Sequence, residues 1–208
     1  MIEVRDLGRV RFQETEILQR ELVAKRMSEG IPDTLLLLEH FPVITMGRRE
    51  SAEDLLVPKE SLQEQGIDFV ETDRGGRLTY HAPGQLVGYF IFKLGKKTIP
   101  QFVSAVEESL IRLLQHYTLK GSKDCHYPGV WIGQKKIAAL GLHFEKGVSR
   151  HGFALNVDCD LRPYQLMYPC GIRERGVTSI LNETGIKPMM SEVKKQIQNE
   201  VSLVPTRL

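Results

Sequence analysis

The sequence predicts an α+β fold in which a mainly antiparallel or mixed sheet is flanked by helices. Strand patterns follow one another across short turns in the second half of the chain, and helical patterns come before and after them. Repeated βαβ units would instead alternate strand and helix patterns. With 208 residues, 41% of them apolar, the chain is long enough for one packed core. No linker or repeat divides it, so we expect one domain over residues 1–208.

The first half of the chain begins with a long helical pattern. Apolar residues recur near helical spacing from residue 13 to 27, and the pattern stops before Gly30 and Pro32. Pro58 is placed to begin a short helix, because its fixed φ suits the first helical turn. The other elements expected here are strands over residues 34–40, 43–47 and 67–73, with the short helix over residues 60–65.

The second half gives the clearest patterns. Residues 85–94 are rich in β-branched and aromatic side chains, which favours a strand. Residues 99–117 form the best helix, with an apolar stripe through Phe102, Val106 and Leu110. The remaining expectations are two strands within residues 128–144 around a tight turn at Gly133-Gln134, a strand over residues 151–161 and an amphipathic helix over residues 191–204.

Composition excludes several classes of function. The formal net charge is only +2, which gives no electrostatic footprint for nucleic acid or a membrane surface. No run of 18 apolar residues predicts a transmembrane helix, and the charged N-terminus does not resemble a signal peptide. The three cysteines are an odd number without CxxC spacing. They predict reduced thiols in the cytoplasm and no structural metal.

Cys170 lies in the stretch "YPCGIRERGVTSI", between a proline and a glycine. Pro169 fixes its own φ, and Gly171 permits backbone conformations that other residues avoid. A thiol on such a turn can be presented to a reactant. The alternative is an ordinary turn with a small packing residue. We expect Cys159 to be a packing residue, and Cys125, which lies before a Pro-Gly turn, to have a structural role.

A glycine-rich loop, "DRGGRLTYHAPGQL" (73–86), is the second candidate. Gly75 and Gly76 would let a ligand approach backbone N–H groups, and Arg74 and Arg77 could neutralise an anion. The spacing matches neither GxGxxG nor GxxxxGK[ST]. A long hairpin loop with turn glycines is the alternative.

The third candidate is "KKIAALG" (135–141). On a strand, Lys136 would share a face with Ala138 and Leu140. A lysine in small, apolar surroundings is disfavoured in its charged form and can act as a base. Alternatively, both lysines lie in the turn and point to solvent.

A reactive thiol needs a neighbouring base or cation. The chain offers Lys136, His81, His151 and the arginines Arg173 and Arg175, and sequence spacing does not choose among them. A Cys–His pair would favour a hydrolase, and a Cys–Lys pair is the less common arrangement.

Four blocks together resemble the octanoyltransferases of lipoate biosynthesis. They are "RGGRLTYHAPGQLVGY" (74–89), "GVWIGQKKIAALGLHF" (129–144), "HGFALNVDCDL" (151–161) and "YPCGIRERGVTSI" (168–180), in the order of that family. The resemblance covers residues 5 to 185. One departure is Ala82, where many members carry glycine. The family shares the fold of biotin and lipoate protein ligase catalytic domains, so the resemblance implies a mixed, mostly antiparallel sheet flanked by helices.

The resemblance also implies the site. The nucleophile, which would carry the acyl group as a thioester, falls on Cys170. The lysine that acts as acid and base, and lowers the pKa of the thiol, falls on Lys136. The residues implied in substrate binding are Arg74, Gly75, Gly76, Arg77, Leu78, Thr79, Tyr80, His81, Ala139, Leu140, Gly141, Gly152, Phe153 and Ala154.

By resemblance, the reaction moves an octanoyl group from acyl carrier protein to a lysine ε-amine on lipoyl domains. The acceptors would be 2-oxoacid dehydrogenase complexes and the glycine cleavage H protein, and the enzyme would be a cytoplasmic monomer. It would need no cofactor, ATP or metal. The rivals are an ATP-dependent ligase on the same fold, a hydrolase pairing Cys170 with His81 or His151, and a non-catalytic carrier-binding module. For docking of the acidic carrier, Arg48, Arg49 and Arg74 are candidates.

Overall fold

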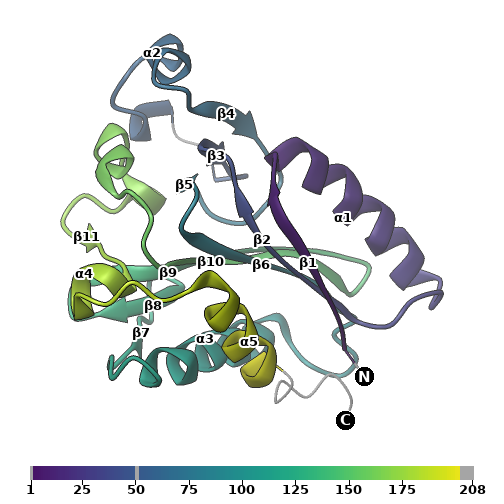
Figure 1. Cartoon of the computed structure of the whole chain (residues 1–208). Helices are drawn as coiled ribbons and strands as arrows, with labels where there is room; N and C mark the ends of the chain where they lie inside the picture. The colour runs from purple at the N-terminus through teal and green to yellow at the C-terminus, as the bar shows by residue number, and fades with distance from the viewer. Residues whose placement is uncertain (1, 50–51, 202–208) are drawn as a thin grey trace.

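The computed structural model describes residues 2–49 and 52–201, apart from the side chains of Ala52 and Cys170. Within that part of the chain, helices cover both faces of a large mixed sheet, and a small sheet stands at one end (Figure 1). The strands are β1 (Glu3–Val10), β2 (Thr34–His40), β3 (Val43–Met46), β4 (Asp68–Glu71), β5 (Leu78–His81), β6 (Gln85–Ile91), β7 (Ser122–Lys123), β8 (Gly129–Ile132), β9 (Lys135–Glu145), β10 (Val148–Asn156) and β11 (Gly176–Val177). The helices are α1 (Phe12–Met27), α2 (Lys59–Glu64), α3 (Ile99–Gln115), α4 (Ile180–Thr184) and α5 (Met190–Val201), with short 3₁₀ turns η1 (Ala52–Asp54), η2 (Arg162–Leu166) and η3 (Pro169–Gly171).

The large sheet has the order β1-β2-β6-β10-β9-β8-β7, and β11 pairs with β9. Only the β1–β2 and β11–β9 pairs are parallel. The small sheet has the order β4-β3-β5, with β4 parallel and β5 antiparallel to β3. The expectation of a mixed, mostly antiparallel sheet flanked by helices is therefore confirmed.

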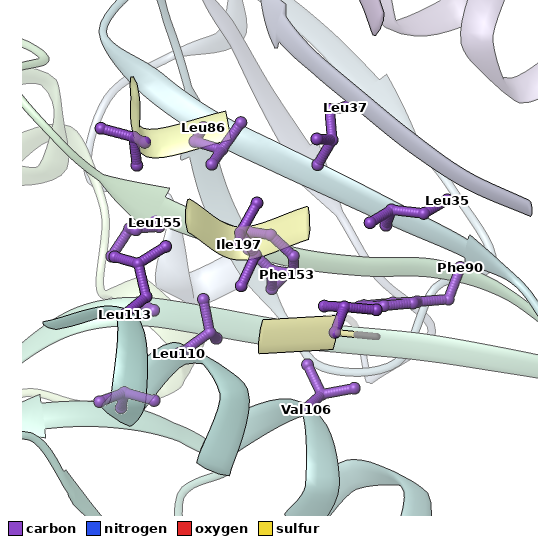
Figure 2. Packing of buried hydrophobic residues seen from close by; sticks show 14 of the residues in the cluster. Leu35, Leu37, Leu86, Phe90, Val106, Leu110, Leu113, Phe153, Leu155 and Ile197 are labelled. Carbon is purple, nitrogen blue, oxygen red and sulfur yellow. The ribbon is translucent and has the colours of Figure 1, made fainter. Parts of the chain in front are cut away.

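Strand alternation places the two hydrophobic cores of the large sheet. Leu35 and Leu37 of β2 face α3 and α5, where the apolar stripe of α3 packs (Figure 2). Leu36 and Leu38 face α1 on the other side, with Phe12. The small sheet has a third core of its own. Each sheet face is thus closed by helices or by the small sheet.

Most expected elements form, with boundaries shifted by a few residues. The helix expected to begin at residue 13 is α1, and α3 begins at a capping box formed by Thr98 and Gln101. The tight turn lies between β8 and β9, with Gly133 at φ +56°. The last helix ends at Val201, and the rest of its expected range lies outside the described residues.

Four strands fall where none was expected: β1, β5 and the two-residue strands β7 and β11. β1 is polar and partly exposed because it is an edge strand, so its sequence lacks the apolar alternation of a half-buried strand. β5 is only four residues long and lies inside the stretch interpreted as one loop. Its pairing with β3 stabilises it, and this partner is distant in sequence.

Gly88 provides a test of the packing between β6 and β10. It pairs with Phe153, and a methyl group added at Gly88 would lie 2.2 Å from the Phe153 ring. We expect Gly88→Ala to lower the free energy of unfolding by about 1–3 kcal/mol, because an overpacked core must shift. Gly30→Ala is the control, since an added methyl there meets nothing closer than 3.5 Å. Urea unfolding measures both, and equal stabilities would contradict this account.

Candidate active site

A narrow, mostly apolar slot lies between the large sheet, the first residue of α1 and the loop before β5. Its volume is about 30 Å³, which is the share of one water molecule. Glycine and alanine form much of one wall. The slot is lined by Phe12, Arg74, Gly76, Thr79, His81, Tyr89, Ala139, Leu140, Gly141, His151, Gly152, Phe153 and Ala154.

Ten of the fourteen residues expected to bind substrate line this slot. Alternation along β5 explains part of the division, because Thr79 and His81 face the slot while Leu78 and Tyr80 pack into the core of the small sheet. Like Leu78 and Tyr80, Gly75 and Arg77 do not line the slot. Gly75 contacts Leu142, and Arg77 pairs with Asp54. Three slot residues were not in the expected set and belong to other elements: Phe12 of α1, Tyr89 of β6 and His151 of β10.

Arg74 holds the loop before β5 in place. Its guanidinium is buried and donates to the carbonyl oxygens of Thr45, Gly75 and Arg77 at 2.6–2.9 Å, and also to the Thr45 hydroxyl. These oxygens compensate for burial of the charge. The geometry therefore does not favour Arg74 as a surface group that neutralises an anion, and its burial also removes it from the candidate docking residues.

The two glycines of the loop allow close backbone packing. The Gly75 N–H donates to the Leu142 carbonyl at 3.1 Å, so this donor is already engaged within the protein. A methyl group added at Gly75 would lie 2.9 Å from that same carbonyl. Gly76 has φ +88°, which glycine adopts without strain. The loop thus joins the small sheet to β9.

Lys136 is buried on β9, whereas Lys135 is exposed. The Lys136 ammonium donates to the Pro128 carbonyl at 3.2 Å and lies 4.9 Å from the Trp131 ring centroid. The β8–β9 register shifts so that Trp131 pairs with Lys136 and Val130 with Ala138, which leaves Ile137 as an extra residue. This bulge interrupts the simple alternation expected for the strand, as bulges near functional sites do.

Cys170 is the middle residue of η3, and its side chain lies outside the described residues. The backbone around it is well defined by contacts. Gly171 has φ +71°, and a methyl group there would lie 2.2 Å from the Arg77 guanidinium. Arg77 in turn pairs with buried Asp54, whose carbonyl accepts from the Tyr168 N–H at 2.7 Å. Arg77 therefore lies against this turn, and η3 packs on β5.

The chain after η3 returns directly to Lys136. Gly176 and Val177 of β11 pair with Lys135 and Lys136, and the Thr178 N–H donates to the Lys136 carbonyl at 3.0 Å. Thus the backbone six residues beyond Cys170 runs beside the buried lysine.

A hydrogen-bonded network continues from this point to the slot. The Asn156 amide donates to the Thr178 carbonyl at 2.9 Å and accepts from Gln85 at 2.8 Å. The Gln85 side-chain oxygen accepts from His81 at 2.7 Å. The wall of the slot and the β11 segment are therefore fixed relative to each other.

Comparison with known proteins gives the family. A model described as the lipoyl protein ligase A/B catalytic domain matches residues 13–202. An octanoyltransferase of Dictyoglomus thermophilum is 46% identical over 189 residues, covering 91% of this chain and 81% of the relative. The chain belongs to the octanoyltransferases of this catalytic-domain family. It is an acyltransferase that transfers octanoyl groups in protein lipoylation.

Solved structures agree on the fold of this octanoyltransferase. A lipoate protein ligase of Thermoplasma acidophilum superposes with a TM-score of 0.74 at 17% identity, covering 97% of this chain and 83% of that one. Biotin protein ligase of Aquifex aeolicus, in complex with biotin and ATP, gives a TM-score of 0.61 at 16% identity, covering 96% and 68%. These likenesses confirm the expected α+β ligase-type fold. Among the described residues, no helix has both the length and the apolar character needed to cross a bilayer.

Within residues 2–49 and 52–201, two clusters of side chains have donor atoms close enough for a metal. Glu16, Asp73 and His151 lie beside the slot, but Asp73 also pairs with Arg150, whose positive charge opposes a cation. The second cluster is Asp124, Cys125 and His126.

In the second cluster, the Cys125 sulfur lies 3.0 Å from Nδ1 of its neighbour His126. Asp124 pairs with Arg175 at 2.6 Å. Cys125 is exposed, and its stretch forms an open loop. Cys159 is buried as expected, and burial raises its pKa to about 12.

Three histidines, His40, His81 and His151, cluster at the slot around Phe12 and Tyr89. The His40 Nδ1–H donates to the Val10 carbonyl, so Nε2 accepts from the Tyr89 hydroxyl at 2.7 Å. Burial lowers the pKa of His81 well below its ordinary value and that of His151 to about 3. Both imidazoles are weak bases, which counts against the hydrolase alternative.

These histidines predict how stability depends on pH. Burial lowers the pKa of His40 from 6.5 to about 4. Below about pH 6.5 the unfolded chain therefore binds more protons than the folded chain. As the pH is lowered in this range, the free energy of unfolding falls by about 1.4 kcal/mol per pH unit for each such histidine. Urea unfolding at about pH 7.5 and about pH 5 measures the slope. His40→Gln should reduce it, whereas His116→Gln, at a half-exposed position, should not. An unchanged slope in His40→Gln would refute the assignment.

Proposed function

We propose that the chain transfers octanoyl groups from acyl carrier protein to lipoyl domains through a thioester on Cys170, with Lys136 as acid and base. One observation carries this proposal: β11 pairs with Lys136, so the segment that follows Cys170 runs beside that lysine. Three residues further along β9, Ala139 begins the slot wall. This arrangement supports a thiol and an amine at one end of an apolar slot.

The first step exchanges one thioester for another. The uncharged amine of Lys136 accepts the Cys170 proton and becomes an ammonium, the thiolate attacks the octanoyl carbonyl, and a carbon–sulfur bond forms. The bond to the carrier sulfur breaks, and that sulfur takes the proton from the Lys136 ammonium. Two thioesters have similar energies, so the step needs no ATP, cofactor or metal.

The second step forms the amide. The acceptor lysine amine attacks the Cys170 thioester, Lys136 accepts the amine proton, and the carbon–sulfur bond breaks as the carbon–nitrogen bond forms. The Cys170 sulfur then recovers the proton. We infer that the acceptors are lipoyl domains of 2-oxoacid dehydrogenase complexes and the glycine cleavage H protein. The enzyme would act as a monomer in the cytoplasm.

Donor docking would occur where basic side chains border the site. Arg48 and Arg49 are exposed beside the loop before β5. Their backbone N–H groups donate to the Arg74 and Gly76 carbonyls, respectively. The backbone of both residues is therefore held against the loop that lines the slot. An acidic carrier would be attracted to this edge, so the rate of transfer should fall with salt.

We expect Cys170→Ser to abolish the octanoylated enzyme. Octanoyl carrier protein is incubated with enzyme, without ATP or acceptor, and the intact protein is weighed by mass spectrometry. The unaltered enzyme should gain one octanoyl group, and so should Cys125→Ser, which removes an exposed thiol. Full transferase activity in Cys170→Ser, or a requirement for ATP, would contradict covalent catalysis. Release of free octanoate without acceptor would identify a hydrolase.

We expect Lys136→Ala to slow acylation of the enzyme by about 10²–10⁴-fold, the usual contribution of acid–base catalysis. Lys135→Ala is the matched control, because Lys135 is its exposed neighbour on the same strand. Single-turnover acylation followed by mass spectrometry gives both rate constants. A loss in Lys135→Ala and not in Lys136→Ala would place the base one residue earlier.

A further inference from the structure

One buried carboxylate beside the candidate base has no part in the steps above. Glu107 lies on α3 among the apolar residues of that helix, and only 6% of it is exposed. Its Oε1 accepts a hydrogen bond from the Gly129 N–H at 2.9 Å. Gly129 is the first residue of β8, directly across from the strand that carries Lys136.

The same peptide unit contacts both charged side chains. The Lys136 ammonium donates to the Pro128 carbonyl, and the next atom along the chain is the Gly129 nitrogen that donates to Glu107. In a trans peptide the C=O and N–H point in opposite directions, so one planar group joins an ammonium to a carboxylate. Each hydrogen bond polarises the peptide in the sense that strengthens the other.

Gly129 is the residue that makes this orientation possible. Its φ of +139° is a backbone conformation that other residues rarely adopt. A methyl group added there would lie 2.5 Å from the Ala138 carbonyl and 3.3 Å from Cε of Lys136. The peptide is thus turned toward α3 while the methylenes of Lys136 pack against its edge.

Other charged side chains lie around Glu107 and Lys136. Burial raises the pKa of Glu107, and the Gly129 hydrogen bond with the charges of Lys123 and Lys136 opposes that shift. Lys123 is itself paired with Glu108. The Arg175 guanidinium also lies 4.9 Å from the Trp131 ring centroid.

We propose that Glu107 is a positioning residue that holds Lys136 through the Pro128–Gly129 peptide. The inference rests on the proposed function for its effect on the reaction. Glu107 fixes the carbonyl that receives the Lys136 ammonium, so the amine stays at the end of the slot. Without the carboxylate, the peptide loses its anchor to α3, and Lys136 becomes more mobile and more accessible.

The test compares four variants in two measurements. Glu107→Ala removes the acceptor, Glu107→Gln keeps an acceptor oxygen, and Glu107→Asp keeps the charge but is one methylene shorter. Glu108→Ala is the matched control, since Glu108 is the exposed neighbour on α3.

The first measurement is the single-turnover rate constant for acylation by octanoyl carrier protein. This first-order constant does not depend on the folded fraction, which changes only the amplitude. The second is trace acetic anhydride labelling of Lys136 relative to Lys135, read on peptides by mass spectrometry.

We expect Glu107→Ala and Glu107→Asp to reduce the rate constant by about tenfold or more, with half-saturation by the donor unchanged. Labelling of Lys136 relative to Lys135 should rise by at least about twofold as the lysine loosens. Glu107→Gln should bring both values within about threefold of the unaltered enzyme, because it can accept the Gly129 N–H. Glu108→Ala should leave both unchanged.

An unchanged labelling ratio in Glu107→Ala and Glu107→Asp would overturn the inference, whatever the activity. Failure of Glu107→Gln to restore the two values would overturn it as well, because the hydrogen bond would then not be the cause. A raised labelling ratio with an unchanged rate constant would support the peptide link and overturn Lys136 as the base. The labelling does not depend on transfer, so the two proposals fail separately.

Discussion

The site depends on the contact between the loop over residues 74–77 and strand β9. The buried guanidinium of Arg74 donates to oxygens of Thr45, Gly75 and Arg77, which compensate for the burial of its charge. This clamp shapes the loop so that the Gly75 N–H reaches the Leu142 carbonyl. The small sheet (Figure 1) is thereby fixed against the large one. The slot is formed where the two sheets meet.

Glycine positions mark the places where backbone must approach backbone. Gly141 faces the same loop, and a methyl group added there would lie 2.9 Å from the Gly75 carbonyl. At Gly152 the added methyl would lie 2.0 Å from the Gly88 carbonyl. Because these residues have no side chain, one wall of the slot is made largely of main chain and small groups, while larger side chains complete the lining. Such a wall holds its shape and leaves few rotamers to rearrange.

Local patterns in the sequence predict most of the elements but not their partners. The stripe of α3 and the turn at Gly133 follow from local spacing, so they could be found without a structure. β1 and β5 depend on pairing with distant strands, and their own residues do not signal it. The bulge at Ile137 is likewise invisible, because it arises from the register with β8.

The same limit applies to the site. The glycine loop could be identified as a candidate from its own composition, whereas the walls around Gly141 and Gly152 follow only from the family resemblance. Phe12 and Tyr89 could not be identified, since a lone aromatic residue at the start of a helix or within a strand is normally core. Glu107 sits next to the apolar stripe of α3, and only the fold brings Gly129 to its carboxylate. Contacts made through a peptide group leave no trace in residue spacing.

The neutral histidines suit a slot for an apolar chain. The slot holds the volume of about one water molecule, so an eight-carbon chain requires its lining side chains to move. Each methylene buried contributes about 0.8 kcal/mol, which can offset such movement over several carbons. That balance would fail if entering carbons also desolvated charged imidazoles. Because burial keeps the pKa of His81 and His151 low, both enter this exchange uncharged, and His81 is already hydrogen-bonded to Gln85. The polarity of the slot is therefore compatible with an acyl chain at neutral pH.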